Sequence, residues 1–254
     1  MSNRILYKYL DAEGGIQMLK NSNLQFTNAT RLNDPFDCHP SLIDFSNVPP
    51  EKTRVWDKDA VMGIESNRSD RLRDSAWICS LSKVHNSLLM WSYYGNHKGV
   101  CIGIDMEKAQ TYLSKVYCKI MIGAIEWDVK YRDIIDKPDY FHDTLDYLQY
   151  QVATKAKAWE HEQEVRLVLF DPSPGLTPFR LRYKPDKEEI MDWREVCFYP
   201  IIGKECFDSI YLGINIEEKK KEDVVRAAKN LNPEIRIFQM GPDPDAFRIR
   251  ETLI

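Results

Sequence analysis

The run 159–170 (WEHEQEVRLVLF) places Glu162, Glu164 and Arg166 two residues apart. Because side chains of an extended strand alternate between its two faces, these three would line up on one side. The apolar residues between and after them would face a core: Val165, Leu167 and Leu169. Two carboxylates separated by two strand rises, roughly 6–7 Å, can hold a sugar hydroxyl, orient a nucleophile or stabilise an oxocarbenium ion. The same pattern is also typical of an exposed charge ladder on a sheet edge, which discourages aggregation.

A second stretch, 88–105 (LLMWSYYGNHKGVCIGID), concentrates rings that carry polar groups: Trp91, Tyr93, Tyr94 and His97. Rings with N–H and O–H groups beside a glycine turn are typical of a pocket wall. At helical spacing, Trp91 and Tyr94 are also consistent with an ordinary core, and His97 with a hydrogen-bonded structural histidine. We expect a pocket wall, and the test is whether Glu164 and Tyr94 open into the same cleft.

The sequence does not support a metal site. None of the five histidines forms an H-x-x-x-H or H-E-x-x-H pattern, and the six cysteines show no C-x-x-C pair. Asp34, Asp37 and His39 form a small acidic cluster, but Asn33-Asp34-Pro35 explains its first member as turn chemistry. A Cys–His or Ser–His nucleophile stays open, because such partners meet only in space.

Composition is that of an ordinary globular protein. The chain has 254 residues, 43% of them hydrophobic and 29% charged, and a formal net charge of −4. Without a basic excess, extensive binding to duplex DNA is disfavoured, although a local basic groove is compatible with these numbers. Scattered cysteines indicate a reducing compartment, and no apolar run is long enough for a leader or a membrane span. We therefore expect a soluble cytoplasmic protein.

The elements that must position these residues are many short strands and a few unevenly spaced helices. The hydrophobic patterns predict strands at 4–10, 23–28, 75–81, 99–105, 164–170, 209–212, 235–240 and 247–253, with one or two more within 116–127. They predict helices at 12–21, 106–114, 138–161 and 216–231, and a short one capped by Asn86 that ends at Tyr94. This order favours α+β with mainly antiparallel sheets, and prolines 172, 174 and 178 break the chain after 170. We expect one domain, 1–254, with a mobile, polar and partly helical insertion around 49–74.

Five sequence blocks resemble a bacterial family of unknown function, number 2971. They are LYKY (6–9), LNDPFD (32–37), MWSYYGNHKGVCIGID (90–105), W-x-x-E-x-E-x-R (159–166) and IYLG (210–213). The blocks keep that family's order and span most of the chain. The resemblance implies no activity.

A more distant resemblance is to ADP-ribosyltransferases, including the DarT-like group that modifies nucleic acid. It is carried by Tyr7 and Tyr9 on an early strand, Ser80-Leu-Ser82 on a middle strand and Glu162-x-Glu164 on a late strand. It implies an ADP-ribosyltransferase-like core with NAD as substrate. By analogy, Glu164 would hydrogen-bond the nicotinamide ribose and Glu162 would help to activate an acceptor. The chain departs from the pattern in lacking an arginine or histidine in the first-strand motif, unless Arg4 or Lys8 serves.

The leading hypothesis is thus an NAD-dependent ADP-ribosyltransferase-like enzyme that modifies nucleic acid or protein, as a toxin or phage-defence effector with an antidote protein as its partner. Glu164 and Glu162 would be catalytic, and the residues expected to contact NAD are Tyr7, Tyr9, Arg31, Ser80, Ser82, Trp91, Tyr94, His97 and Arg166. Among them, Arg31 or Arg166 would meet phosphate. The alternative is a non-catalytic nucleotide- or RNA-binding module that stacks a base on the rings of 91–97. A metal-dependent nuclease would need a tighter carboxylate cluster than the sequence suggests.

Overall fold

The computed structural model describes residues 4–117, 122–143, 146–170, 182–184, 187–189 and 197–254. Within them, a ten-stranded sheet organises the chain. Its main path runs through β11 (Cys197–Phe198), β2 (Phe26–Asn28), β3 (Ala76–Ser82), β1 (Ile5–Leu10), β4 (Val100–Asp105), β12 (Phe207–Leu212), β13 (Arg236–Pro242) and β14 (Ile249–Leu253). All neighbours on this path are antiparallel except β12 and β13. That parallel pair needs a crossover connection, which α6 (Glu218–Leu231) provides. The α+β class with mainly antiparallel pairing is confirmed.

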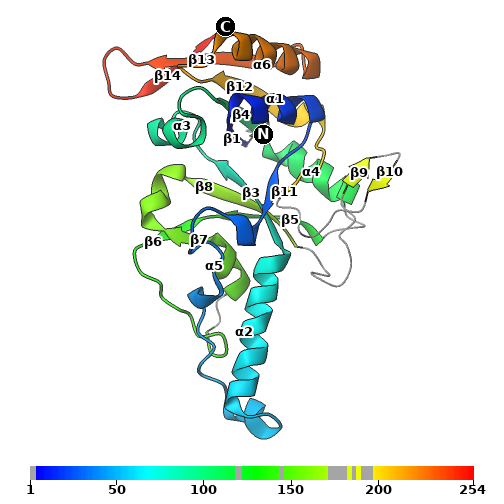
Figure 1. Cartoon of the computed structure of the whole chain (residues 1–254), viewed down its shortest axis with the longest axis vertical. Helices are drawn as coiled ribbons and strands as arrows, with labels where there is room; N and C mark the ends of the chain where they lie inside the picture. The colour runs from blue at the N-terminus through cyan, green and yellow to red at the C-terminus, as the bar shows by residue number, and fades with distance from the viewer. Residues whose placement is uncertain (1–3, 118–121, 144–145, 171–181, 185–186, 190–196) are drawn as a thin grey trace.

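Strand β3 is the junction of the sheet (Figure 1). Along one edge it pairs with β8 (Glu164–Phe170) over its full length, and β8 continues to β5 (Ile122–Asp128). Along the other edge it pairs with β2 near its start and with β1 only at its end, where Tyr7 faces Ser82. The strands β1 and β2 therefore diverge from one edge of β3, and the cavity described below lies at this divergence.

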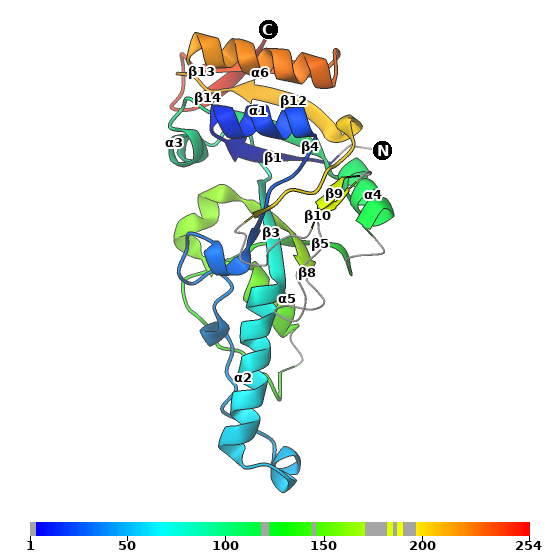
Figure 2. The same cartoon turned by 45° about the vertical axis from the view of Figure 1, so that its right-hand side comes forward.

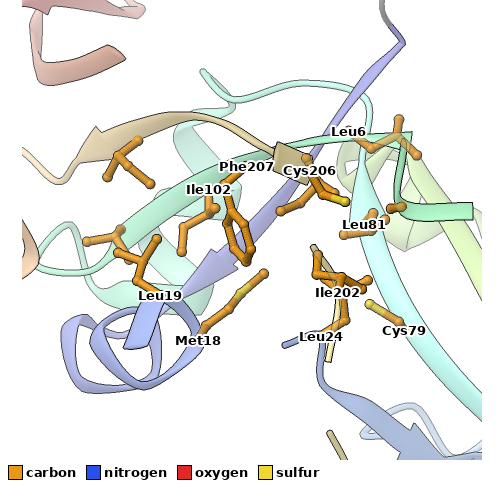
Figure 3. Close-up of a cluster of buried hydrophobic side chains, with 14 of the residues drawn as sticks. Leu6, Met18, Leu19, Leu24, Cys79, Leu81, Ile102, Ile202, Cys206 and Phe207 are labelled. Atoms are coloured by element: carbon orange, nitrogen blue, oxygen red, sulfur yellow. The ribbon is translucent and has the colours of Figure 1, made fainter. Parts of the chain in front are cut away.

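Helices cover both faces of the upper part of the sheet. The helices α1 (Ala12–Asn21) and α6 lie side by side on one face (Figures 1 and 2). Their apolar residues join those of β1, β4 and β12 in the largest buried cluster, where Met18 and Leu19 pack beside Ile102 and Phe207 (Figure 3). The opposite face is covered by α3 (Leu88–Gly95), whose Trp91 packs with Tyr9, Cys101 and Tyr211 of the sheet. Helix α4 (Met106–Tyr117) follows β4 and packs against β5.

Most of the polar insertion predicted around 49–74 is helical. Helix α2 (Lys58–Ser75) follows the 3₁₀ helix η3 (Pro50–Arg54) and projects away from the sheet as an arm (Figure 1). Its first turn is capped by the carboxylate of Asp57, which accepts from the N–H of Ala60 at 2.7 Å. The helix is not exposed to solvent on all sides. Buried Ser69 donates a hydrogen bond to Gln151 at 2.8 Å, which ties the arm to the body of the protein.

The helix predicted over 138–161 is wrong. Within the described residues, the structure has α5 (Tyr147–Ala153), then β7 (Thr154–Ala156) and the 3₁₀ helix η4 (Lys157–Glu162). The side chain of Asp146 accepts from the N–H groups of Leu148 and Gln149, which sets the start of α5. Residues 154–156 pair with β6 (Lys130–Arg132), so their backbone is extended and not helical. Local helical spacing could not reveal that long-range pairing.

Smaller differences concern the ends of elements. The cap of α3 is Ser87 rather than Asn86, and α4 extends into the region 116–127 where only strands were predicted. Strand β2 is shorter than the predicted 23–28. The antiparallel pair β9 (Arg182–Lys184) and β10 (Lys187–Glu189) forms a separate two-stranded sheet. Prolines 172, 174 and 178 and Cys118 lie outside the described residues, and the described cysteines are free.

None of the described helices combines the length and the apolar character that a membrane span requires.

Candidate active site

Strand β8 buries the charged residues that the sequence placed on it. Glu164 is 4% exposed and Arg166 0% exposed, because β8 lies between β3 and β5. The alternative prediction, an exposed charge ladder on a sheet edge, is therefore wrong. The apolar residues of the opposite face lie in the main core as expected: Val165, Leu167 and Leu169. The strand register brings three predicted positions into one row, since Ser82 of β3 lies opposite both Tyr7 of β1 and Glu164 of β8.

Glu162 reaches the same site by a different route from the one predicted. It is the last residue of η4 and not part of β8, because Gln163 between them adopts a left-handed conformation with φ of 44°. Its side chain is nevertheless buried. Its Oε1 accepts from the phenol of Tyr94 at 2.5 Å, and its Oε2 accepts from Lys155 Nζ at 2.6 Å. The two glutamates thus converge without sharing a strand face.

Glu164 is held by two cations. Arg166 donates to it through Nε at 2.9 Å and Nη2 at 3.1 Å, and Lys155 Nζ donates to its Oε2 at 3.3 Å. Burial alone would raise the pKa of Glu164, but the guanidinium and ammonium groups outweigh it and hold that pKa at about 2. This carboxylate is therefore ionised at every physiological pH.

Asp37 completes the arrangement from the loop after β2. Its Oδ1 accepts from Arg166 Nη2 at 2.8 Å, whereas its Oδ2 lies 3.9 Å from Lys155 Nζ. Burial raises the pKa of Asp37, and Arg166 and Lys155 offset only part of that effect. The predicted turn presents it, because Asp34 Oδ1 accepts from the N–H of Phe36 at 2.9 Å and the Asp34 carbonyl accepts from the N–H of Asp37 at 3.0 Å. We call Asp37, Lys155, Glu162, Glu164 and Arg166 the charge cluster.

Lys155 is the member of the charge cluster that sequence reasoning missed. It is 6% exposed, its ammonium lies between three carboxylates, and it also sits 4.8 Å from the ring centroid of Trp159. Burial lowers the pKa of Lys155, but Glu164, Asp37 and Glu162 together raise it above its ordinary value, so the lysine stays charged. The wrong helix over 138–161 concealed it, since a lysine on a charged helix gives no signal of burial.

A cavity of about 260 Å³ opens beside the charge cluster. The predicted site residues that line it are Tyr7, Tyr9, Arg31, Ser80, Ser82, Tyr94, Glu162, Glu164 and Arg166. Glu164 and Tyr94 thus share one cleft. The cavity also has lining residues that were not predicted as site residues, among them Lys8, Asp37 and Lys155.

Trp91 and His97 do not reach this cavity. Trp91 is 1% exposed, and its indole Nε1 donates to the carbonyl of His85 at 2.8 Å. His97 has a φ of 58° and follows the left-handed Asn96 that ends α3, and its carbonyl accepts from the N–H of Asn215 at 2.8 Å. The indole of Trp91 is therefore a core ring and is not exposed to stack a base, as the alternative binding module would require of the rings of 91–97.

Among the described residues, four cations line the cavity, and two of them, Lys155 and Arg166, are paired with carboxylates. Arg166 directs its donors to Glu164, Asp37, the carbonyl of Val152 and the Cys38 sulfur, so none is left for a phosphate. Lys8 instead donates to the carbonyl of Ser80 at 3.0 Å, and Arg31 is exposed. Neither Lys8 nor Arg31 forms an ion pair with a carboxylate in the described part of the chain. These two side chains are available to an anionic ligand.

No group of histidine, cysteine, aspartate and glutamate among the described residues is placed to hold a metal ion. In the charge cluster, the position between the carboxylates is instead filled by the ammonium of Lys155.

Residues 90–167 match the model of the family described as "Protein of unknown function (DUF2971)". The matched span includes most of α3 with Tyr94, and the chain from β7 to the first half of β8 with Lys155, Glu162, Glu164 and Arg166, but not Asp37. No match to the chain was found among curated proteins or among solved structures. Because the description of the family names no activity, function must be argued from the geometry.

Proposed function

We propose that this protein is an NAD-dependent ADP-ribosyltransferase-like enzyme, which breaks the bond between nicotinamide and ribose and transfers ADP-ribose to an acceptor. The observation that carries the proposal is the charge of the buried cluster beside the cavity. Three carboxylates (Asp37, Glu162 and Glu164) face two cations (Lys155 and Arg166), which leaves one net negative charge when all are ionised.

A buried negative charge suits this reaction. Loss of nicotinamide takes the electron pair of the C–N bond and leaves positive charge on the ribose ring. Fixed charges in a site shielded from water stabilise such a developing charge, because they need no reorganisation during the reaction. Glu164 suits that role, because its pKa of about 2 keeps it ionised and Arg166 keeps it in place.

The two glutamates differ in what they can still bind. A carboxylate offers about four lone-pair sites. Glu164 accepts from Arg166 twice and from Lys155, whereas Glu162 accepts once on each oxygen, from Tyr94 and from Lys155. Glu162 therefore has the greater capacity to accept a ribose hydroxyl, while Glu164 acts through its charge.

The size of the cavity limits which part of NAD it would enclose. Pockets that bury a drug-sized ligand measure roughly 300–1,000 Å³, and this cavity measures about 260 Å³. It would hold the nicotinamide and its ribose between Tyr7, Tyr94 and the carboxylates. The pyrophosphate would then lie towards Arg31 and Lys8, which among the cations of the cavity lining are the two that form no ion pair within the described residues.

The test is to incubate the purified protein with labelled NAD and with RNA, DNA or protein as the acceptor. We expect the wild type to release nicotinamide and to label one acceptor class, and Glu164→Gln to lose at least about 100-fold in rate. The matched control is Glu65→Gln, since Glu65 is also buried and paired with a cation, Arg68, but does not line the cavity. If the wild type neither releases nicotinamide nor transfers label, the proposal is wrong. The class of acceptor that becomes labelled would also show whether a toxin or defence effector of this kind modifies nucleic acid or protein.

A further inference from the structure

The three carboxylates of the charge cluster differ in how fully they are hydrogen-bonded. Both oxygens of Glu164 and both oxygens of Glu162 accept hydrogen bonds from charged or phenolic donors. Asp37 differs, because only its Oδ1 accepts a side-chain hydrogen bond within the described chain, from Arg166. Its Oδ2 forms an ion pair with Lys155 Nζ at 3.9 Å, beyond hydrogen-bond distance. Asp37 Oδ2 is thus the carboxylate oxygen of the cluster that can receive a proton without losing a hydrogen bond, and its ion pair with Lys155 is the longest of the three that Lys155 forms.

The surroundings of Asp37 favour its acceptance of a proton. Asp37 lines the cavity, is 2% exposed, and faces Arg166, Lys155, Glu164 and the thiol of its neighbour Cys38. Burial raises the pKa of Asp37 above its ordinary value, whereas the pKa of Glu164 is about 2. A general base is more effective as its pKa approaches the working pH, so Asp37 is a better proton acceptor than Glu164.

Glu162 is less suited to this step, although the sequence resemblance assigned acceptor activation to it. A proton on Glu162 would cancel the charge that holds Lys155 Nζ at 2.6 Å and would compete with the phenol of Tyr94. The buried ammonium would then lose its closest partner, which is costly in a water-free site.

We propose that Asp37 is the catalytic base of this site and takes the proton of the attacking acceptor through Oδ2. This inference rests on the function proposed above. The electron pair of the glycosidic C–N bond leaves with nicotinamide, and a lone pair of the acceptor forms the new bond to the ribose carbon. The proton of the acceptor O–H or N–H moves to Asp37, which later releases it to solvent. With water as the acceptor, the product is ADP-ribose.

The experiment compares water with azide as the acceptor in Asp37→Asn, with nicotinamide release from NAD as the readout. Azide carries no proton to remove, so it needs no base. We expect Asp37→Asn to lose about 100-fold in hydrolysis and to regain most of the rate with azide, forming ADP-ribosyl azide. We expect Glu164→Gln to stay slow with both acceptors, because its defect lies in charge stabilisation. The control is Glu65→Gln, a buried carboxylate paired with Arg68 that does not line the cavity, which should match the wild type.

Each outcome decides between the two proposals. An active wild type with an unimpaired Asp37→Asn, or with a folded Asp37→Asn that azide does not restore, overturns the role of Asp37 alone. A wild type that releases no nicotinamide with either acceptor overturns the proposed function and this inference with it. If Asp37→Asn does not fold, the test is made with the wild type, by measuring both reactions over the pH range in which azide stays ionised. Within that range, the rate of hydrolysis should fall as the pH is lowered, while the rate of the reaction with azide stays constant. An identical fall in both rates would contradict the inference.

Discussion

At the residue scale, Lys155 explains how three carboxylates can share one buried site. Like charges brought this close would force protonation of at least one of them, and an ammonium between them removes much of that repulsion. Lys155 lies within 4 Å of all three, and Arg166 contacts two of them. The lysine therefore takes the place that a metal ion occupies in many acidic sites.

Removal of that ammonium should be costly. In Lys155→Met, Glu162 loses the donor at 2.6 Å and Glu164 loses one of its two cations. Breaking a buried ion pair from one side destabilises a protein by about 3–5 kcal/mol, and we expect a loss in that range. The measurement is the free energy of unfolding in urea. The control, Lys157→Met, removes an exposed pair with Asp133 and should change stability by less than about 0.5 kcal/mol. Equal losses in the two variants would show that the cluster is not held by Lys155.

Glu164 should also make stability depend on pH. Its folded-state pKa of about 2 lies below its ordinary value of 4.5, so its contribution is complete above that value and is lost as the pH falls towards 2. A shift of this size corresponds to about 3 kcal/mol. The raised pKa of Asp37 acts in the opposite sense, because its ionised form costs stability that acid restores. The difference in unfolding free energy between wild type and Glu164→Gln should therefore shrink below about pH 4.5. A difference that stays constant down to about pH 3 would contradict this role.

At the element scale, sequence reasoning succeeded where one pattern decides an element. Strand β8 has the predicted bounds, because alternate apolar residues from Val165 onwards can only face a core from an extended chain. Sequence reasoning failed where the secondary structure of a segment depends on pairing with a distant part of the chain. Thr154–Ala156 is extended because it pairs with Lys130–Arg132, and no local feature announces that contact. The same failure concealed Lys155, whereas Asp37 was noticed in its acidic turn but not linked to Arg166, which lies more than a hundred residues away in the chain.

The break between η4 and β8 gives an element-scale prediction. Gln163 has a φ of 44°, a conformation that costs non-glycine residues about 1–2 kcal/mol. Gln163→Gly should therefore be neutral or stabilising by up to about 1 kcal/mol, and Gln163→Val should be destabilising by about 1–2 kcal/mol. Thermal unfolding of the two variants measures this. If the two variants change stability by the same amount, residue 163 does not hold the strained left-handed conformation.

At the scale of the whole molecule, the candidate site depends on the divergence of β1 and β2 from one edge of β3. The types of most site residues could be predicted from sequence, including Tyr7, Ser82 and Glu164. Their row across three strands could not, because register is a property of the paired sheet and not of any one strand. The cavity therefore draws on segments from residue 7 to residue 166, and its lining forms only when these segments have packed together.

The most direct test of the central claim is the amount of nicotinamide that the complete chain releases from NAD in the presence of a cell extract that supplies every class of acceptor. We expect steady release by the wild type, release lower by at least about 100-fold with Glu164→Gln, and wild-type release with Glu65→Gln. No release by the wild type, or equal release by the wild type and Glu164→Gln, would contradict the account.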